Sequence, residues 1–186
     1  MSISFRFHPE KAIEAAAMLL KLHGKPMKYI GLLKMLYIAD RIALERMDQP
    51  ITGDKGYSLD WGLVPSNVYN LIKGNSVDNA LPLWQKYISK NDDGYTVSLK
   101  ASPPNDYVSE KAQQIIKEVY EKYGHLNPFD LAMLTHDFPE WEDPHGSSIP
   151  VNVDNVLRYM NKPEEEIEAI RQEAAREAYL DMVLAA

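Results

Sequence analysis

The 186-residue sequence predicts a mainly α-helical fold of the α+β class, a compact helical domain with a small antiparallel β-sheet or hairpin. Three observations support this class. Apolar residues recur at helical spacing over most of the chain, glycine or proline stands where these segments end, and only two short stretches alternate like strands. We divide the chain into a main domain, residues 1–160, and an acidic amphipathic C-terminal helix, residues 161–186, that packs on this domain or extends it.

Two helices are predicted before residue 50. The first runs from Pro9 to His23, because proline suits the first turn of a helix and Gly24 can end it in a left-handed conformation. After the loop GKP, the run MKYIGLLKMLYIADRIALERM repeats apolar residues at helical spacing and places them on more than one face. This pattern predicts a long, largely buried second helix that forms a hairpin with the first.

The next segment, QPITGDKGYSLDWGLVP, interrupts the helical pattern with glycines and prolines. Within it Tyr57, Leu59 and Trp61 alternate with polar neighbours, which predicts a short strand. A short helix that ends at Gly74 is expected next. The run WQKYISKNDDGYTVSLK predicts a β-hairpin around residues 91–94, and we expect this hairpin to form one small sheet with the strand near Tyr57.

The remaining third of the chain predicts helices with clear start and stop signals. SPPNDYVSEKAQQIIKEVYEKYG is a helix with Asp106 or Ser109 as its N-cap and Gly124 at its end. NPFDLAMLTH begins a further helix at the N-cap Asn127. A short helix spans residues 151–160, and the last segment, NKPEEEIEAIRQEAAREAYLDMVLAA, is a helix whose first turn carries glutamates, where the helix dipole favours them.

Composition and charge narrow the function classes. The absence of cysteine excludes iron–sulfur clusters, thiolate zinc sites and cysteine nucleophiles. The formal net charge of −7 disfavours a dominant nucleic-acid surface, which rests on clustered cations, and favours a basic partner. The N-terminal sequence MSISFRFHPEK lacks the apolar core of a signal peptide, and no segment reaches the apolar length of a membrane span. We therefore expect a soluble, cytoplasmic protein.

The stretch LTHDFPEWEDPHG concentrates residue types that bind metals or perform acid–base catalysis. His136 and His145 are separated by two prolines and a tryptophan, so the spacing of a helical metal-binding pair is absent. A structural interpretation covers each part: His136 suits a helix C-terminus, Pro139 ends that helix, and Trp141 packs onto the core. We favour it and predict no metal or cofactor. A metal-dependent enzyme built around His125, His136 and His145 is kept as an alternative.

Two other polar groups are candidates for chemistry. Asp40 and Arg41 lie among apolar neighbours on the second helix, and no second carboxylate or histidine base stands at a telling spacing. We expect Asp40 to cap the following glycine-rich turn or to pair with a cation there. The TGDKG run, which contains Gly53 and Asp54, has glycines and a lysine like a phosphate-binding loop. It lacks the GxxxxGK(S/T) spacing of such loops and therefore predicts a turn.

A DNA-binding protein is the second alternative. Two helices joined by GKP and followed by strands are compatible with a winged-helix transcriptional regulator, whose second helix would present Lys28, Lys34 and Arg41 to DNA. The apolar residues on several faces of that helix favour burial over insertion into a groove, and the net charge opposes DNA binding.

Two blocks of the sequence resemble the Panacea domain, also called the SocA-like antitoxin or phage-associated GepA-type domain. The first block, Lys34 to Gly74, reads KMLYIADRIALERMDQPITGDKGYSLDWGLVPSNVYNLIKG. The second consists of YGHL at residues 123–126, LTH at residues 134–136, Pro139 and Trp141. The two blocks occur in the order that the family shows.

The resemblance covers residues 12–159, which is most of the main domain. Leu63 stands where the family commonly has proline, and residues 75–99 have no match. The resemblance marks the following positions as family signature: Asp40, Arg41, Gly53, Asp54, Gly62, Pro65, Tyr69, His136, Pro139 and Trp141.

The resemblance implies an antitoxin, a small helical protein that binds and neutralises a cognate toxin encoded beside it in bacteria or their phages. In one variant the antitoxin is an adaptor that delivers the toxin to a protease. We expect no enzymatic activity and no catalytic residue. Aromatic and acidic side chains are the candidates for partner binding, since aromatic anchors suit interfaces and acidic groups complement a basic toxin. These candidates are Tyr57, Trp61, Trp84, Glu140, Glu142 and Asp143.

Overall fold

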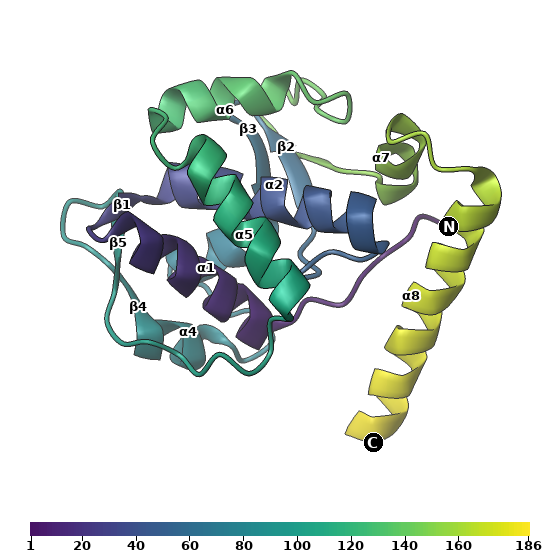
Figure 1. Cartoon of the computed structure of the whole chain (residues 1–186), viewed down its shortest axis with the longest axis horizontal. Coiled ribbons are helices and arrows are strands. Elements are labelled where there is room, and N and C mark those ends of the chain that lie inside the picture. The colour runs from purple at the N-terminus through teal and green to yellow at the C-terminus, as the bar shows by residue number, and fades with distance from the viewer.

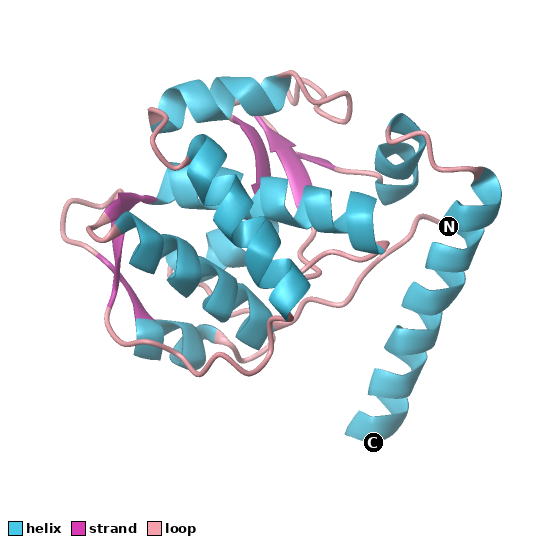
Figure 2. Cartoon of the chain, viewed as in Figure 1, coloured by secondary structure: helices cyan, strands magenta, loops and turns pink.

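The computed structural model describes residues 1–186 and confirms a mainly helical α+β fold. Figure 2 shows helices in every part of the molecule and two small groups of strands. The helices are α1 (Pro9–His23), α2 (Tyr29–Met47), α3 (Ser66–Ile72), α4 (Leu81–Tyr87), α5 (Glu110–Tyr123), α6 (Pro128–His136), α7 (Val153–Tyr159) and α8 (Glu164–Ala185). The strands are β1 (Met27–Lys28), β2 (Gly56–Leu59), β3 (Gly62–Pro65), β4 (Ile88–Lys90), β5 (Thr96–Leu99) and β6 (Ile149–Pro150).

The main hydrophobic core surrounds α2. This helix contacts α1, α3, α5, α6 and β3, and eleven of its nineteen residues are buried. In Figure 1 it crosses the middle of the molecule, with α5 in front of it and α6 above it. A helix that is apolar on several faces is stable only where other elements cover those faces. The central position of α2 therefore follows directly from its sequence.

The helix ends follow the local signals of the sequence. Gly24 ends α1 with a φ of 72°, in the left-handed conformation that glycine adopts without strain. Ser109 caps α5 by accepting a hydrogen bond from the backbone N–H of Ala112, and Asn127 caps α6 by accepting one from Phe129. These predicted boundaries are confirmed.

The strands form two separate three-stranded antiparallel sheets, with orders β3–β2–β6 and β1–β5–β4. The prediction of a single sheet that joins the strand near Tyr57 to the hairpin near Asp92 is wrong. The hairpin β4–β5 pairs instead with β1, through Met27 opposite Val97. The strand at Tyr57 pairs with β3 across a tight turn and with β6, which lies between α6 and α7. Each sheet thus obtains its third strand from a segment too short to be recognised in the sequence.

The C-terminal helix α8 packs on a second, smaller core. Ile167, Ile170 and Ala174 are buried there against residues that include Ile3 and Leu157. Beyond Ala174 the side chains of α8 are mostly exposed, and Figure 1 shows the helix extending along one edge of the molecule, beside the N-terminus. No helix of the fold combines the length and the apolar character that crossing a membrane requires.

Candidate functional site

The signature residues gather around the β2–β3 hairpin and the two loops that hold it. The turn between the strands contains Gly62 at a φ of 91°, in the left-handed region that favours glycine. A Cβ atom at this position would lie 2.8 Å from the backbone oxygen of Ala132 on α6, and closer still to the side-chain hydroxyl of Thr135. Glycine is therefore required here both by conformation and by the close approach of α6.

A buried lysine anchors the first residue after this glycine. Lys34 on α2 is only 1% exposed, and its ammonium group donates a hydrogen bond of 2.9 Å to the backbone oxygen of Leu63. The N–H of Leu63 donates to the hydroxyl of Thr135 at 3.2 Å. Burial lowers the pKa of Lys34 to about 7, since the charged form loses its hydration. Helices α2 and α6 therefore hold β3 from two sides.

The histidine and tryptophan of LTHDFPEWEDPHG hold the other strand. His136 places Nδ1 3.0 Å from the backbone oxygen of Ala132 and Nε2 2.9 Å from that of Asp60. Trp141 donates its indole N–H to the backbone oxygen of Leu59 at 3.1 Å, and its ring packs edge-on against His136 with centroids 4.3 Å apart. Both ring nitrogens of His136 thus face backbone carbonyls, as they would in a structural role.

A buried ion pair connects the same loop to α2. Arg41 donates two hydrogen bonds to the carboxylate of Glu140, at 2.7 and 3.2 Å, and the hydroxyl of Tyr37 donates a third at 3.0 Å. Burial and the charge of Glu140 raise the pKa of Tyr37 well above its usual range. Phe138 lies under the guanidinium group, 4.6 Å from its ring centroid. Pro139 links Phe138 to Glu140 and thereby places both side chains against α2.

Glu140 was predicted from the sequence to contact a partner, and its burial contradicts this expectation. The residue is only 6% exposed, because Arg41 and Tyr37 neutralise and solvate its carboxylate inside the protein. Sequence spacing gave no sign of this pairing, since the two charged residues are 99 positions apart.

Two half-buried aspartates fix the loop between α2 and α3. Asp40 accepts hydrogen bonds of 2.9 Å from the N–H groups of Ile51 and Thr52, and it also contacts the Thr52 hydroxyl. Burial raises the pKa of Asp40 to about 6. Of the two expected roles of Asp40, capping the turn or pairing with a cation there, the structure shows the cap. The partners of the carboxylate are backbone amides and a hydroxyl.

Asp54 acts on the next helix. Its two carboxylate oxygens each accept a hydrogen bond of 2.9 Å, from the N–H groups of Asn67 and Val68 in the first turn of α3. Burial raises the pKa of Asp54 to about 7, and the nearby charge of Asp40 adds to this effect. The preceding Gly53 has a φ of 71° and approaches the backbone of Arg6 so closely that a side chain would clash. The TGDKG run is therefore a helix-capping turn.

The residues that make these contacts lie within a region that matches one protein family. Residues 32–142 match the family model described as the antitoxin SocA-like, Panacea domain. The chain belongs to this family. Neither the comparison with curated proteins nor the comparison with solved structures produced a match. The matched residues include every signature position described above, and they support an antitoxin role in general.

The remaining signature residues of this Panacea domain lie at the same hairpin. Pro65 is buried at the end of β3, opposite Gly56 of β2, and precedes the first turn of α3. Tyr69 on α3 is half-buried, and its ring lies 6.3 Å from that of Tyr29. The ammonium group of Lys73 lies over the Tyr69 ring, 4.6 Å from its centroid.

The predicted partner-binding aromatics separate into buried and exposed residues. Trp84 is 2% exposed, because residues 81–87 form α4 and bury this side chain in the main core, so it is not available to a partner. Tyr57 is half-buried against the same core. Trp61 is 60% exposed at the tip of the β2–β3 hairpin, and Glu142 and Asp143 are also exposed.

Trp61 belongs to a larger apolar area that the sequence analysis missed. Its ring packs edge-on against Phe129 with centroids 6.0 Å apart. Phe129 and Met133, one turn apart on α6, are 45% and 57% exposed. We call Trp61, Phe129 and Met133 the α6 surface. The signal for it was present in the sequence, since α6 is apolar on the face that buries Leu131 and also on the opposite face.

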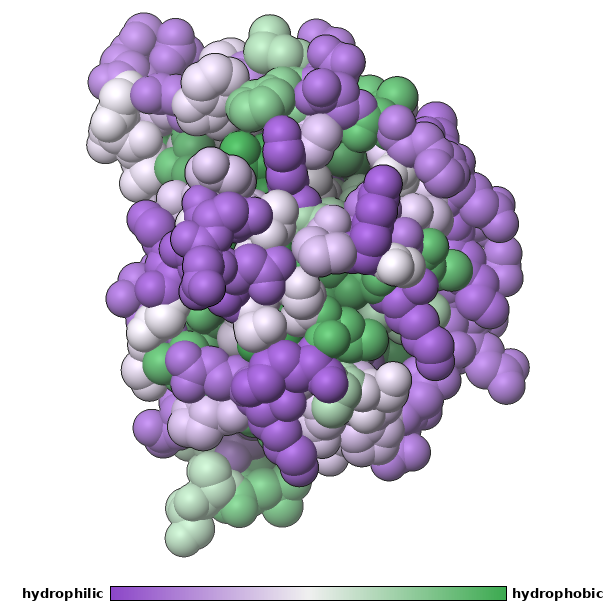
Figure 3. Space-filling view, turned by 90° about the vertical axis from the view of Figure 1, so that its left-hand side faces the viewer, coloured by the Kyte–Doolittle hydropathy of each residue, from purple (hydrophilic) through white to green (hydrophobic).

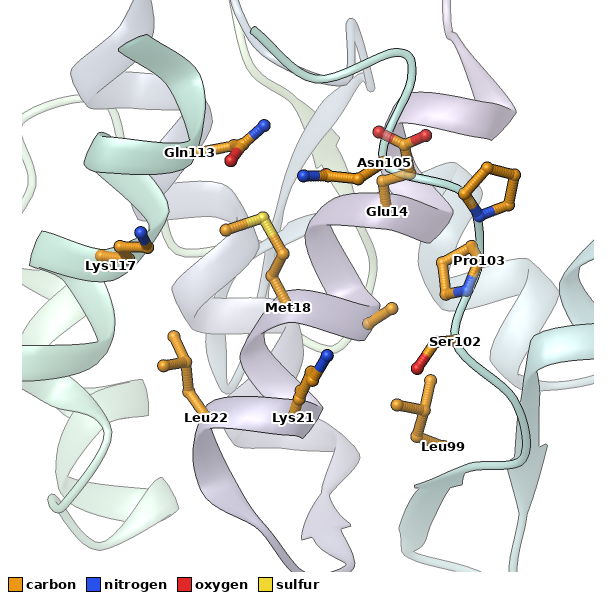
Figure 4. A pocket seen from close by; sticks show the side chains of 12 residues that line it. Glu14, Met18, Lys21, Leu22, Leu99, Ser102, Pro103, Asn105, Gln113 and Lys117 are labelled. Carbon is orange, nitrogen blue, oxygen red and sulfur yellow. The ribbon is translucent and has the colours of Figure 1, made fainter. Parts of the chain in front are cut away.

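Two cavities of the Panacea domain lie beside α2 and α1. The cavity beside Asp40, Arg41 and Asp54 has a volume of about 60 Å³, far below the 300–1,000 Å³ that is usual for small-molecule sites. A larger one, of about 400 Å³, lies between α1, α5 and the loop after β5. Figure 4 shows Met18 in its centre, with Lys117 on one wall and Ser102 on the other. No histidine lines it, so Ser102 has no neighbouring base of the usual kind.

Glu14 shapes this larger cavity. Its buried carboxylate accepts hydrogen bonds of 2.9 to 3.1 Å from three consecutive backbone N–H groups, those of Asp106, Tyr107 and Val108. One side chain of α1 thus fixes the loop that forms the wall. Nothing in the sequence pattern distinguished Glu14 from an ordinary surface glutamate.

The structure favours neither the three-histidine metal site nor the DNA-reading second helix on which the two alternatives were based. No group of three or more histidine, aspartate or glutamate side chains is arranged to hold a metal ion. His145 is exposed beside Asp143, and His125 packs against Tyr120. For DNA binding, α2 would have to enter a groove, but it is the central helix of the core and buries Lys34.

Proposed function

We propose that this protein is a cytoplasmic antitoxin that neutralises a cognate protein toxin, encoded beside it, by direct stoichiometric binding and without catalytic turnover. The observation that carries the proposal is the α6 surface. Trp61, Phe129 and Met133 together present three large apolar side chains to solvent on one side of the matched family region. Aromatic residues of this kind are the usual energetic centres of protein interfaces.

Acidic residues border the α6 surface. Asp60 precedes Trp61, Asp130 is exposed on α6, and the exposed Asp137 follows the last residue of this helix. The loop after α6 adds two more, Glu142 and Asp143, and it is tied to the hairpin because the N–H of Gly146 donates to Asp60 at 2.9 Å. An apolar centre with a charged rim is the common anatomy of a protein interface. The sign of this rim suits a basic partner and would accelerate its association.

The contacts of the signature residues support the same proposal. Gly62 and His136 fix the tip of the β2–β3 hairpin against α6, and Lys34 ties it to α2, so the position of Trp61 is set before any partner arrives. A surface that is rigid in the free protein loses little conformational entropy on binding. A binding protein benefits from this arrangement, whereas a catalytic centre would need reactive groups that the hairpin does not offer.

The test is co-expression with the product of the adjacent reading frame. The wild-type protein should restore growth and form a stable complex in pull-down experiments. The double variant Trp61→Ala/Met133→Ala should bind at least about 100-fold more weakly, since two exposed interface anchors of about 1.5–3 kcal/mol each are lost. The matched control is Tyr179→Ala/Met182→Ala on the exposed end of α8, which should retain full binding.

Two outcomes would contradict this proposal. If the wild-type protein neither binds the neighbouring product nor restores growth, the antitoxin function fails for that pair. If both double variants bind equally well, the α6 surface is not the docking site. The amount of toxin in the rescued cells separates the mechanisms further. Direct occlusion leaves the toxin level unchanged, whereas a proteolytic adaptor lowers it.

A further inference from the structure

A basic cavity opens next to the α6 surface. It has a volume of about 620 Å³ and lies between the C-terminal ends of α1 and α5, the strand β1 and the first turns of α2 and α6. Four basic side chains line it, those of His23, Lys25, Lys28 and His125, and no aspartate or glutamate does. Figure 3 views the molecule from the side of β1 and β5, where hydrophilic side chains stand around small apolar areas.

The charges of this cavity have no counterpart within the chain. None of the four basic side chains takes part in an ion pair with a carboxylate. Burial lowers the pKa of His23, and the neighbouring charges of Lys25 and His125 lower it further. In a chain with a net charge of −7, the positive charges of Lys25 and Lys28 stand together beside two histidines, and the two lysines repel each other until an anion arrives.

The cavity is held in shape by an aromatic side chain of α5. Tyr120 is buried between the two histidines, with ring centroids 6.1 Å from His23 and 5.5 Å from His125. Its hydroxyl lies 3.1 Å from Nδ1 of His23. The floor is apolar, because Met27, Met35 and Leu131 line it.

The cavity and the α6 surface are continuous. Lys28 lines the cavity and also lies 5.4 Å from the ring centroid of Phe129. Leu126 and Pro128, which lead into α6, form the border between the two. A protein that covers Phe129 therefore also reaches the basic side chains.

We propose that this cavity receives an acidic segment of the toxin, with carboxylates against Lys25, Lys28 and the two histidines and one apolar side chain on the floor. The inference rests on the function proposed above and extends it. The toxin carries a basic area opposite the rim of the α6 surface and an acidic segment beside it. Opposite charges at the two ends of the interface fix the orientation of the partner, because the reversed orientation would place like charges together.

The test compares two double charge reversals of equal magnitude. Lys25→Glu/Lys28→Glu changes the cavity, and Lys86→Glu/Lys90→Glu changes two exposed lysines of α4 and β4. With the purified product of the adjacent reading frame, calorimetry should show at least a tenfold loss of affinity for the first variant. The second should stay within twofold of the wild type. Circular dichroism and melting curves verify that both variants are folded.

The results separate this inference from the proposed function. If the wild-type protein does not bind the product, the function itself fails. If it binds and the two charge-reversed variants bind equally, the function stands and the acidic segment is refuted. Overlapping peptides from the toxin sequence give an independent reading. Acidic peptides should bind the wild type and not Lys25→Glu/Lys28→Glu, and binding confined to peptides without acidic residues overturns the proposal.

A further experiment tests whether the basic cavity binds a phosphorylated ligand and not an acidic protein segment. Inorganic pyrophosphate is added to the wild type and to Lys25→Glu/Lys28→Glu, and binding is followed by calorimetry. Pyrophosphate binding that depends on the two lysines, together with unchanged toxin affinity in the variant, would assign the cavity to a phosphorylated ligand and overturn the proposal.

Discussion

The stability of this fold should depend on pH through one buried lysine. Lys34 is 1% exposed, its only hydrogen bond goes to the backbone oxygen of Leu63, and no carboxylate pairs with it. Its pKa falls from the ordinary value of 10.5 to about 7 because burial removes water from the ammonium group. The substitution Lys34→Met keeps the unbranched shape of the side chain and removes the titrating group.

The sign of the effect follows from proton binding. Between pH 7 and 10.5 the unfolded chain holds the proton of Lys34, whereas the folded protein releases it, so stability rises with pH in this range. Each pKa unit corresponds to about 1.4 kcal/mol, and the whole difference corresponds to about 5 kcal/mol. From pH 7 to pH 9 the free energy of unfolding of the wild type should therefore rise by about 2 kcal/mol relative to Lys34→Met.

Urea denaturation at pH 7, 8 and 9 measures this difference. Other titrating groups are shared by the two proteins, so their contributions cancel in the comparison. Lys28→Met, which removes an exposed lysine, is the matched control and should give a pH dependence parallel to that of the wild type. Parallel curves for the wild type and Lys34→Met would refute the reasoning, because they would show that Lys34 keeps its proton in the folded protein.

Three further substitutions test the contacts of the signature residues by urea or thermal denaturation. Asp40→Ala leaves two backbone N–H groups without an acceptor and should cost about 2–4 kcal/mol; an unchanged melting temperature would show that the loop does not need this carboxylate. Gly62→Ala should cost at least about 3 kcal/mol because its Cβ meets α6, whereas Gly74→Ala, also at positive φ but with open space around it, should cost only about 1 kcal/mol. Equal losses for the two glycines would exclude the clash. Glu140→Gln weakens a buried ion pair and should cost about 3 kcal/mol, and a loss no larger than that of Glu142→Gln, an exposed control, would contradict the role of burial.

The sequence predicts most of the helices because their signals are local. The bounds of α1 follow from Pro9 and Gly24, and the starts of α5 and α6 follow from Ser109 and Asn127. Each of these residues acts on a backbone group within a few positions, and the physical chemistry of such caps is the same in every fold. The central place of α2 was also accessible, since a helix that is apolar on several faces must be covered.

The strand pairings of the two sheets could not be predicted from local sequence patterns. Segment 84–100 has two alternating runs around residues 91–94 like a hairpin, yet residues 81–87 are helical, with Pro82 in the first turn. The two-residue strands β1 and β6 have no pattern of their own, and they exist only because β5 and β2 offer free edges. Pairing between distant segments depends on the assembled fold and leaves no periodic trace in the sequence.

The sequence identified several residues of the candidate site, but it did not predict which side chains and backbone groups they contact. The signature positions drew attention to Asp40, Arg41 and His136, and the structure places all of them around one hairpin and its loops. The roles of Lys34 and Glu140 depend on burial, which is decided by partners 29 and 99 residues away. Arg41 is visible in the sequence as a charged residue of an apolar helix, but its neutralising partner Glu140 is not.

The buried contacts and the exposed surface are parts of one arrangement. Gly62 allows α6 to approach the hairpin, and this approach places Trp61 against Phe129. The hydrogen bonds of His136 and Thr135 then hold the hairpin on either side of Trp61, at Asp60 and at Leu63. The residues that define the family therefore do not contact the toxin in our proposal; they determine where the contacting residues stand. Because α6 forms both the apolar surface and the border of the basic cavity, one rigid helix sets the distance between the two areas that a toxin would have to match.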